Sequence, residues 1–155
     1  MRKFATYRVE LDRNKHPVLL KEKEYDYTVG ILDSPGIIAE LLQEVYRLKF
    51  LAEENLYMIA LDSKCQILGI FRVCSGGMNS AYVDAKSILM RALLTGATGF
   101  VLAHNHPSGL TEPSYEDLQC IKKVKKAGDL IDIKLLDFLI VGDESYYSAK
   151  ENETL

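Results

Sequence analysis

The chain has 155 residues, which is typical of one compact domain, and its 48% hydrophobic and 26% charged residues match an ordinary folded protein. Its net charge of -3 gives no general reason for nucleic acid to bind, because that affinity comes largely from basic side chains that neutralise phosphates. The sequence shows neither an export signal nor an apolar run of membrane-spanning length, so we expect a cytoplasmic protein.

The first 33 residues predict a β-prone extension ahead of the main domain. Residues 4–11 alternate and are rich in strand-forming types, and the polar run over residues 12–15, followed by Pro17, is typical of a turn. We therefore expect a short N-terminal hairpin within residues 1–33.

Residues 34–150 predict a single layered domain. The expected elements are a helix over 35–50, strands over 56–61 and 66–74, a helix that includes Val83 and ends near Gly96, a strand over 100–103, a helix from Ser114 to Gly128 and a strand over 131–141. This order predicts an α/β fold in which a mixed β-sheet is layered between helices. The polar tail over 151–155 has nothing to pack and is expected to fray.

Three cysteines, Cys65, Cys74 and Cys120, are odd in number and show no C-x-x-C pairing. That pattern argues against a disulfide framework and against a thiolate zinc cluster, so we interpret them as reduced structural thiols. Cys120 lies three residues after Asp117 and shares its helix face, but core packing is the expected role.

A group of candidate metal ligands follows the strand predicted over 100–103. His104 and His106 are separated by one residue, so at a strand end both rings can project from the same side. Asp117 lies in the first turn of the helix that begins near Ser114, close enough to fold back as a third ligand. Two imidazoles and one carboxylate leave the fourth tetrahedral position open for water, which is typical of a catalytic zinc site. Such a site also accepts other divalent ions.

These residues resemble a known pattern. His104, His106, Ser114 and Asp117 have the spacing of the JAMM motif of the JAB/MPN metalloproteases, and the surrounding string resembles the bacterial RadC-like branch, historically labelled DNA repair proteins. The resemblance covers roughly residues 34–148. It implies the JAB/MPN fold, which is similar to that of cytidine deaminases, and one zinc ion per chain.

The resemblance also implies two catalytic residues. Alignment on Leu61-Asp62 places the family's general base at Glu54, and Glu53 is the neighbouring rival, because only one of two adjacent strand side chains can point into the site. Ser114 matches the serine whose hydroxyl helps to hold the oxyanion. A helix N-cap would explain the same serine, and both roles can coexist.

Three features differ from the family pattern. Residues 84–87 read Asp-Ala-Lys-Ser where relatives usually carry His-Pro-Arg-Glu, and residue 138 is Phe where they carry His. Neither change touches a proposed metal ligand, so both bear on substrate or partner contacts. Full RadC-like proteins often carry an N-terminal helix-hairpin-helix segment suited to DNA, and only about 33 different residues precede the shared domain here.

The leading hypothesis is therefore a JAMM-type zinc metallopeptidase that cleaves peptide or isopeptide bonds in an unidentified peptide or protein substrate. The alternative, which the family label suggests, is a non-catalytic DNA-repair or mobile-element accessory that contacts DNA or a protein partner. The acidic balance counts against it, and the basic cluster Lys122-Lys123 and Lys125-Lys126 is usually just a solvated helix face. A zinc deaminase would need H-x-E with P-C-x-x-C, and this chain has H-x-H and no C-x-x-C.

Overall fold

The computed structural model describes residues 2–27, 32–76 and 84–155. Within these ranges seven strands form one sheet in the order β2-β1-β4-β3-β5-β6-β7. The strands are β1 (Arg2–Leu11), β2 (Pro17–Tyr27), β3 (Asn55–Leu61), β4 (Ile67–Ser75), β5 (Gly99–Asn105), β6 (Lys134–Val141) and β7 (Tyr146–Ser148). The helices are α1 (Pro35–Tyr46), the short 3-10 helix η1 (Leu48–Phe50), α2 (Ala85–Thr95) and α3 (Tyr115–Leu130). Parallel and antiparallel pairs occur together, which confirms the predicted mixed α/β sheet.

Strands β3 and β5 form the centre of the sheet, and every residue in both is buried. Successive side chains alternate between the two faces, so Met58 joins one core cluster and Ile59 joins the other. Burial on both faces requires a near-continuous apolar run rather than alternation of polar and apolar residues. The helices therefore cover both faces of the sheet, as predicted.

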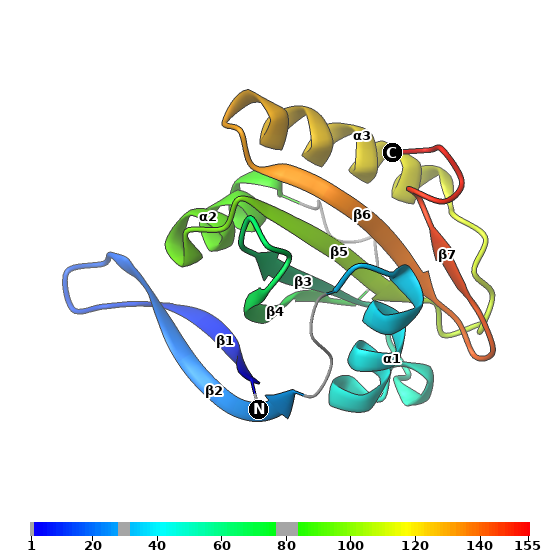
Figure 1. Cartoon of the computed structure of the whole chain (residues 1–155), viewed down its shortest axis with the longest axis horizontal. Coiled ribbons are helices and arrows are strands. Elements are labelled where there is room, and N and C mark those ends of the chain that lie inside the picture. The colour runs from blue at the N-terminus through cyan, green and yellow to red at the C-terminus, as the bar shows by residue number, and fades with distance from the viewer. Residues whose placement is uncertain (1, 28–31, 77–83) are drawn as a thin grey trace.

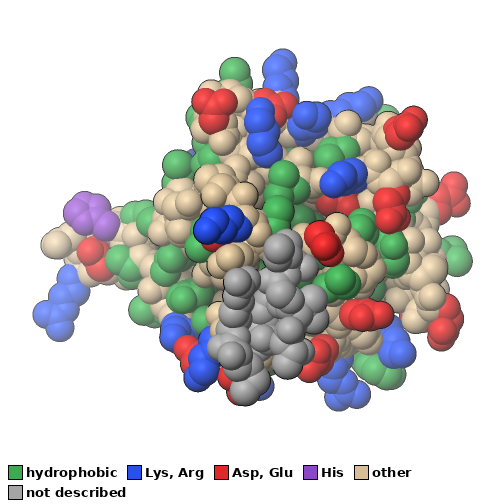
Figure 2. All heavy atoms as spheres, viewed as in Figure 1, with side chains coloured by type: hydrophobic (Ala, Val, Ile, Leu, Met, Phe, Trp, Pro, Cys, Tyr) green, Lys and Arg blue, Asp and Glu red, His purple; other side chains and the backbone are tan. Residues whose placement is uncertain are grey.

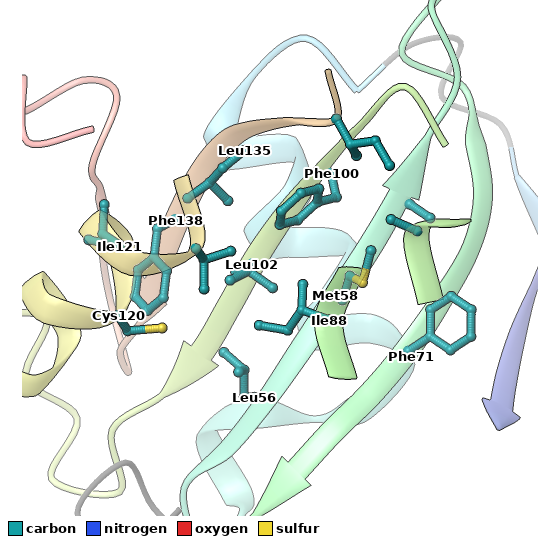
Figure 3. Close-up of a cluster of buried hydrophobic side chains, with 14 of the residues drawn as sticks. Leu56, Met58, Phe71, Ile88, Phe100, Leu102, Cys120, Ile121, Leu135 and Phe138 are labelled. Carbon is teal, nitrogen blue, oxygen red and sulfur yellow. The ribbon is translucent and has the colours of Figure 1, made fainter. Parts of the chain in front are cut away.

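Helices α2 and α3 cover one face, and α1 with η1 covers the other. Figure 3 shows the first layer, where Ile88 of α2 and Ile121 of α3 lie with Leu102 and Phe138 of the sheet. In the second layer the buried residues of α1 and η1 contact the opposite side chains of β3 and β5. Figure 1 shows α3 lying along β6. No helix in the described ranges is long and apolar enough to span a membrane.

The N-terminal hairpin is confirmed, and it also extends the sheet. Strand β1 pairs in parallel with β4 through Thr6–Ile70 and Tyr7–Phe71, while the far end of the hairpin projects away from the domain (Figure 1). A Cβ atom on Gly69 would lie 2.9 Å from the Tyr7 ring, so glycine permits this close approach. The boundary between the extension and the main domain at residue 33 stays a prediction.

The helix predicted over 35–50 is divided at Arg47. This residue adopts a left-handed conformation, with φ of 54°, and its N–H donates to the Gln43 carbonyl at 2.8 Å. Leu48 then turns into the core, where it is fully buried, and starts η1. Burial of Leu48 outweighs continuation of the helical pattern.

The boundary predicted between the third helix and the strand that follows it also differs from the structure. Gly128 does not end the helix: α3 continues to Leu130, and the strand begins at Lys134 rather than at residue 131. A Cβ on Gly128 would lie 2.3 Å from the Ile133 carbonyl oxygen, so this glycine permits a close chain contact instead of a helix stop.

The start of α2 and the C-terminal tail are the remaining two segment ends for which the sequence makes a prediction. Val83 lies outside the described residues, and α2 begins after Asp84, whose side chain accepts a hydrogen bond from the Lys86 N–H. At the C-terminus the structure differs from the frayed tail predicted over 151–155. Asn152 and Thr154 donate hydrogen bonds back to the Ser148 and Ala149 carbonyls, because the chain folds back against β7.

Candidate metal centre

The two histidines lie at the end of β5 and face the layer formed by α2 and α3. His104 pairs across the sheet with Leu56 and Ile140, both of which belong to that layer. His106 follows just beyond the strand, and the two rings are nearly perpendicular, with centroids 4.8 Å apart. The same-side arrangement predicted from the one-residue spacing is therefore present.

Asp117 reaches the histidines from the first turn of α3. Its carboxylate Oδ2 accepts a hydrogen bond from the Ser114 N–H at 2.8 Å, and its own N–H donates to Ser114 Oγ at 3.1 Å. This reciprocal capping box fixes the first turn of the helix. It leaves Asp117 Oδ1 3.1 Å from His104 Nε2, and Oδ2 3.4 Å from His106 Nε2.

The hydrogen bonds of the histidines show which ring atoms face Asp117. His106 Nδ1 lies 2.9 Å from the Leu110 carbonyl, which only accepts, so Nδ1 carries the proton. His104 Nδ1 likewise lies 2.5 Å from Glu54 Oε1, a carboxylate oxygen. In the neutral form of each ring, Nε2 therefore directs a lone pair towards the carboxylate of Asp117.

That arrangement fits a metal ion. His104 Nε2 and Asp117 Oδ1 are buried, and neither has a hydrogen-bond partner among the described residues. The facing lone pairs of neutral rings and the carboxylate, 3.1–3.4 Å apart, repel unless a proton or a metal ion lies between them. Two ligand atoms that each lie about 2.0–2.1 Å from a tetrahedral ion are themselves about 3.3 Å apart. His104, His106 and Asp117 would hold such an ion through nitrogen and oxygen donors suited to zinc.

The charges of the cluster also favour a cation. Burial alone would lower the pKa of His104, but the adjoining carboxylates of Asp117 and Glu54 outweigh burial and raise it. Burial would raise the pKa of Asp117, and contact with His104 together with the Ser114 hydrogen bonds lowers it instead. The site therefore stabilises positive charge beside its carboxylates.

Glu54, and not Glu53, reaches the cluster. One ligand atom from each of Glu54, His104, His106 and Asp117 lies within 4.8 Å of every other. The exposed Glu53 side chain instead accepts a hydrogen bond from Ser75 Oγ at 3.2 Å. The side chains of Glu54 and His106 are 22% and 16% exposed, whereas those of His104 and Asp117 are fully buried. The cluster is thus closed on one side and open to solvent beside Glu54.

The loop between His106 and Ser114 is held by a contact with the β6–β7 turn. Gly109 has φ of +78°, and its carbonyl accepts a hydrogen bond from the Asp143 N–H at 3.3 Å. A Cβ on Gly109 would lie 2.4 Å from Asp143 Oδ2, so only glycine fits without displacement. This contact helps to place Leu110, whose carbonyl orients His106.

Two residues close to the proposed ligands in sequence, Cys120 and Tyr115, do not belong to the cluster. Cys120 is buried, and burial raises the pKa of its thiol to about 12, with a smaller effect from the charge of Asp117. It is therefore a packing thiol, as predicted, rather than a thiolate ligand. Tyr115, at the start of α3, is 71% exposed.

The comparisons with known proteins agree with this geometry. The family model described as "RadC-like JAB domain" matches residues 32–154. A UPF0758 protein of Clostridium novyi is 39% identical over 127 residues, a match that covers 82% of this chain and 55% of the relative. UPF0758 proteins of Moorella thermoacetica and Alkaliphilus metalliredigens are 34% and 32% identical, over 81% and 80% of this chain and 54% and 53% of theirs. The chain spans about half the length of these relatives, and residues 1–31 lie outside the family match.

Proposed function

The chain belongs to the RadC-like JAB domain family, and from that premise we propose that it is a zinc-dependent hydrolase of the JAMM type that cleaves peptide or isopeptide bonds. The observation that carries the proposal is the convergence of two imidazole Nε2 atoms on one buried carboxylate. His104 Nε2 and Asp117 Oδ1 lie 3.1 Å apart, and neither has a hydrogen-bond partner in the described part of the chain. The solvent-open side beside Glu54 gives a substrate access to the centre.

His104, His106 and Asp117 would hold one zinc ion per chain. When bound, zinc lowers the pKa of a water molecule from about 15.7 towards 7 and polarises a carbonyl group. These nitrogen and oxygen donors would supply the three protein ligands that a catalytic zinc site needs.

Glu54 would act as the general base. Its carboxylate lies 3.9 Å from His106 Nε2 on the open side, where it can take a proton from the attacking water and pass it to the leaving amine. Its contact with His104 Nδ1 also orients that ring, as carboxylates beside metal-binding histidines commonly do.

Ser114 would stabilise the oxyanion that forms during attack on the carbonyl. Its Oγ accepts from the Asp117 N–H, so its single hydroxyl hydrogen is available to donate to a substrate oxygen. The cap and the proposed catalytic role therefore use different parts of the same hydroxyl group.

Metal analysis and a peptide assay together test the proposal. We expect mass spectrometry to find about one zinc per chain in the wild type and in Glu54→Gln, and almost none in His104→Ala or Asp117→Ala. The zinc-loaded wild type should cleave members of a proteome-derived peptide library, and Glu54→Gln should not. Failure of the wild type to take up added zinc would overturn the proposal.

The second candidate, a non-catalytic accessory that contacts DNA, rests on the lysines of α3. Lys122, Lys123 and Lys126 are exposed, while Lys125 forms an ion pair with Asp129 at 3.1 Å. Figure 2 shows basic and acidic side chains side by side along this part of the surface. Filter binding to DNA separates the candidates, since phosphate contacts would give an affinity that falls steeply with salt. The group of candidate metal ligands, Glu54, His104, His106 and Asp117, favours the hydrolase.

A further inference from the structure

The residue between the two histidines has a distinct environment. Asn105 pairs with Val141 on β6, a member of the α1 layer, so its side chain points to the face opposite His104. It is only 1% exposed. A buried amide needs partners for both its donor and its acceptor, and the position of those partners indicates what it holds in place.

Both partners of Asn105 are backbone groups on either side of Glu54. Its Oδ1 accepts from the Asn55 N–H at 2.9 Å, and its Nδ2 donates to the Glu53 carbonyl at 3.0 Å. The Glu54 carbonyl accepts from the Gly76 N–H at 2.9 Å. The two peptide groups that meet at the Cα atom of Glu54 are thus fixed by hydrogen bonds.

The two Asn105 hydrogen bonds lie beyond the end of the pairing between β3 and β5. The backbone ladder between β3 and β5 runs from Leu61–Gly99 to Leu56–His104 and ends there, two residues before Glu54. In the absence of further ladder pairing, the Asn105 side chain connects the segment that carries Glu54 to the strand that carries His104. One strand therefore supports both the ligand and the carboxylate beside it.

We infer that Asn105 is a positioning residue that holds the Glu54 carboxylate against His104 and the metal centre. The inference rests on the proposed function, because it assigns Asn105 a role through Glu54 and not through contact with substrate. A merely structural role would predict a general loss of stability that does not depend on the side chain at position 54.

Zinc affinity, measured by competition with a chromophoric chelator, separates these roles. The set consists of the wild type, Glu54→Gln, Asn105→Ala and the double variant. Residues that orient metal ligands typically change affinity by about 10–100-fold, so we expect Asn105→Ala and Glu54→Gln each to weaken zinc binding about tenfold. The double variant should be no weaker than Glu54→Gln alone, because Asn105 acts through Glu54.

Two further variants control for packing. Asn105→Leu removes both hydrogen bonds while filling the space, so it should reproduce Asn105→Ala even if the smaller side chain destabilises the fold. Asn55→Ala removes a neighbouring buried amide that also donates to the Glu53 carbonyl, at 2.9 Å, but leaves both Asn105 bonds intact. We expect it to bind zinc with an affinity within about twofold of the wild type.

The outcomes for the two proposals are distinguishable. A loss of affinity that is equal in the wild-type and Glu54→Gln backgrounds, or no loss in Asn105→Ala, would overturn the positioning role. Zinc binding with a non-additive cycle but without cleavage of any library peptide would support the positioning role and overturn the hydrolase. If a peptide is cleaved, Asn105→Ala should lower kcat and leave KM unchanged. Absence of zinc uptake by the wild type would overturn both.

Discussion

Substitution of Ser114 separates helix capping from metal binding and catalysis. The serine takes part in two hydrogen bonds with Asp117, one through its Oγ and one through its backbone N–H. Ser114→Ala removes only the first. The N–H bond to Asp117 Oδ2 remains, so the carboxylate that would bind the metal keeps its orientation.

The magnitudes follow from that division. Loss of an N-cap side chain costs about 1 kcal/mol of unfolding free energy, within a range of about 0.5–2 kcal/mol. For a chain of 155 residues, a change of that size lowers Tm by about 2–4 °C. Zinc stoichiometry should remain at about one per chain. If the hydroxyl stabilises an oxyanion, kcat should fall by about 10²–10³-fold.

Thermal unfolding, zinc analysis and peptide cleavage measure the three effects. Ser114→Asp is the matched control, because its carboxylate oxygen can cap the helix but has no hydrogen to donate to an oxyanion. We expect it to restore Tm without restoring kcat. Loss of zinc from Ser114→Ala would refute the division of roles, and an unchanged Tm would show that the Oγ bond does not stabilise α3.

Three other perturbations give further predictions. Zinc at about 100 times its Kd should raise the unfolding free energy by about 2.7 kcal/mol, as measured by chemical denaturation, and His104→Ala should show no such gain. Leu102→Ala, in the fully buried layer against α2 and α3, should cost about 2–5 kcal/mol in the same assay, and a cost below 1 kcal/mol would contradict its place in the core. Hydrogen bonds from Lys3 and Lys21 lower the pKa of Glu24 from 4.5 to about 2, so its stabilisation should be complete above pH 4.5 and lost as pH falls through 2. An NMR titration midpoint of Glu24 near 4.5 would refute this.

The parts of the site that local sequence could predict are those fixed by short spacings. His104 and His106 needed only strand alternation, and Asp117 needed only the start of a helix. Glu54 was predictable only through the family resemblance, because it lies 50 residues before His104 and the periodicity of its own segment does not distinguish it from Glu53. The structure places Glu54 in the cluster, and its catalytic role stays a proposal.

The features that sequence did not predict depend on contacts between distant segments. The parallel pairing of β1 with β4 joins Thr6 to Ile70, and no local pattern in either strand specifies it. The three-residue strand β7 is too short to show a period and exists because β6 offers an unpaired edge. The hydrogen bonds of Asn105 likewise join residues about 50 positions apart.

The arrangement around β5 makes the register of this strand a condition for the site. A slip of one residue would exchange the faces of every side chain, so that Asn105 would point towards α3 and both histidines would point away from Asp117. Gly99 opposes such a slip at the other end of the strand, because a Cβ there would lie 2.9 Å from the Leu136 side chain and 3.2 Å from the Lys134 carbonyl oxygen. A residue with a side chain can take that place only if the Leu136 side chain moves and the Lys134 carbonyl shifts by a few tenths of an ångström. The glycine that starts the strand and the amide that ends it therefore both maintain the alignment that brings His104, His106 and Glu54 together.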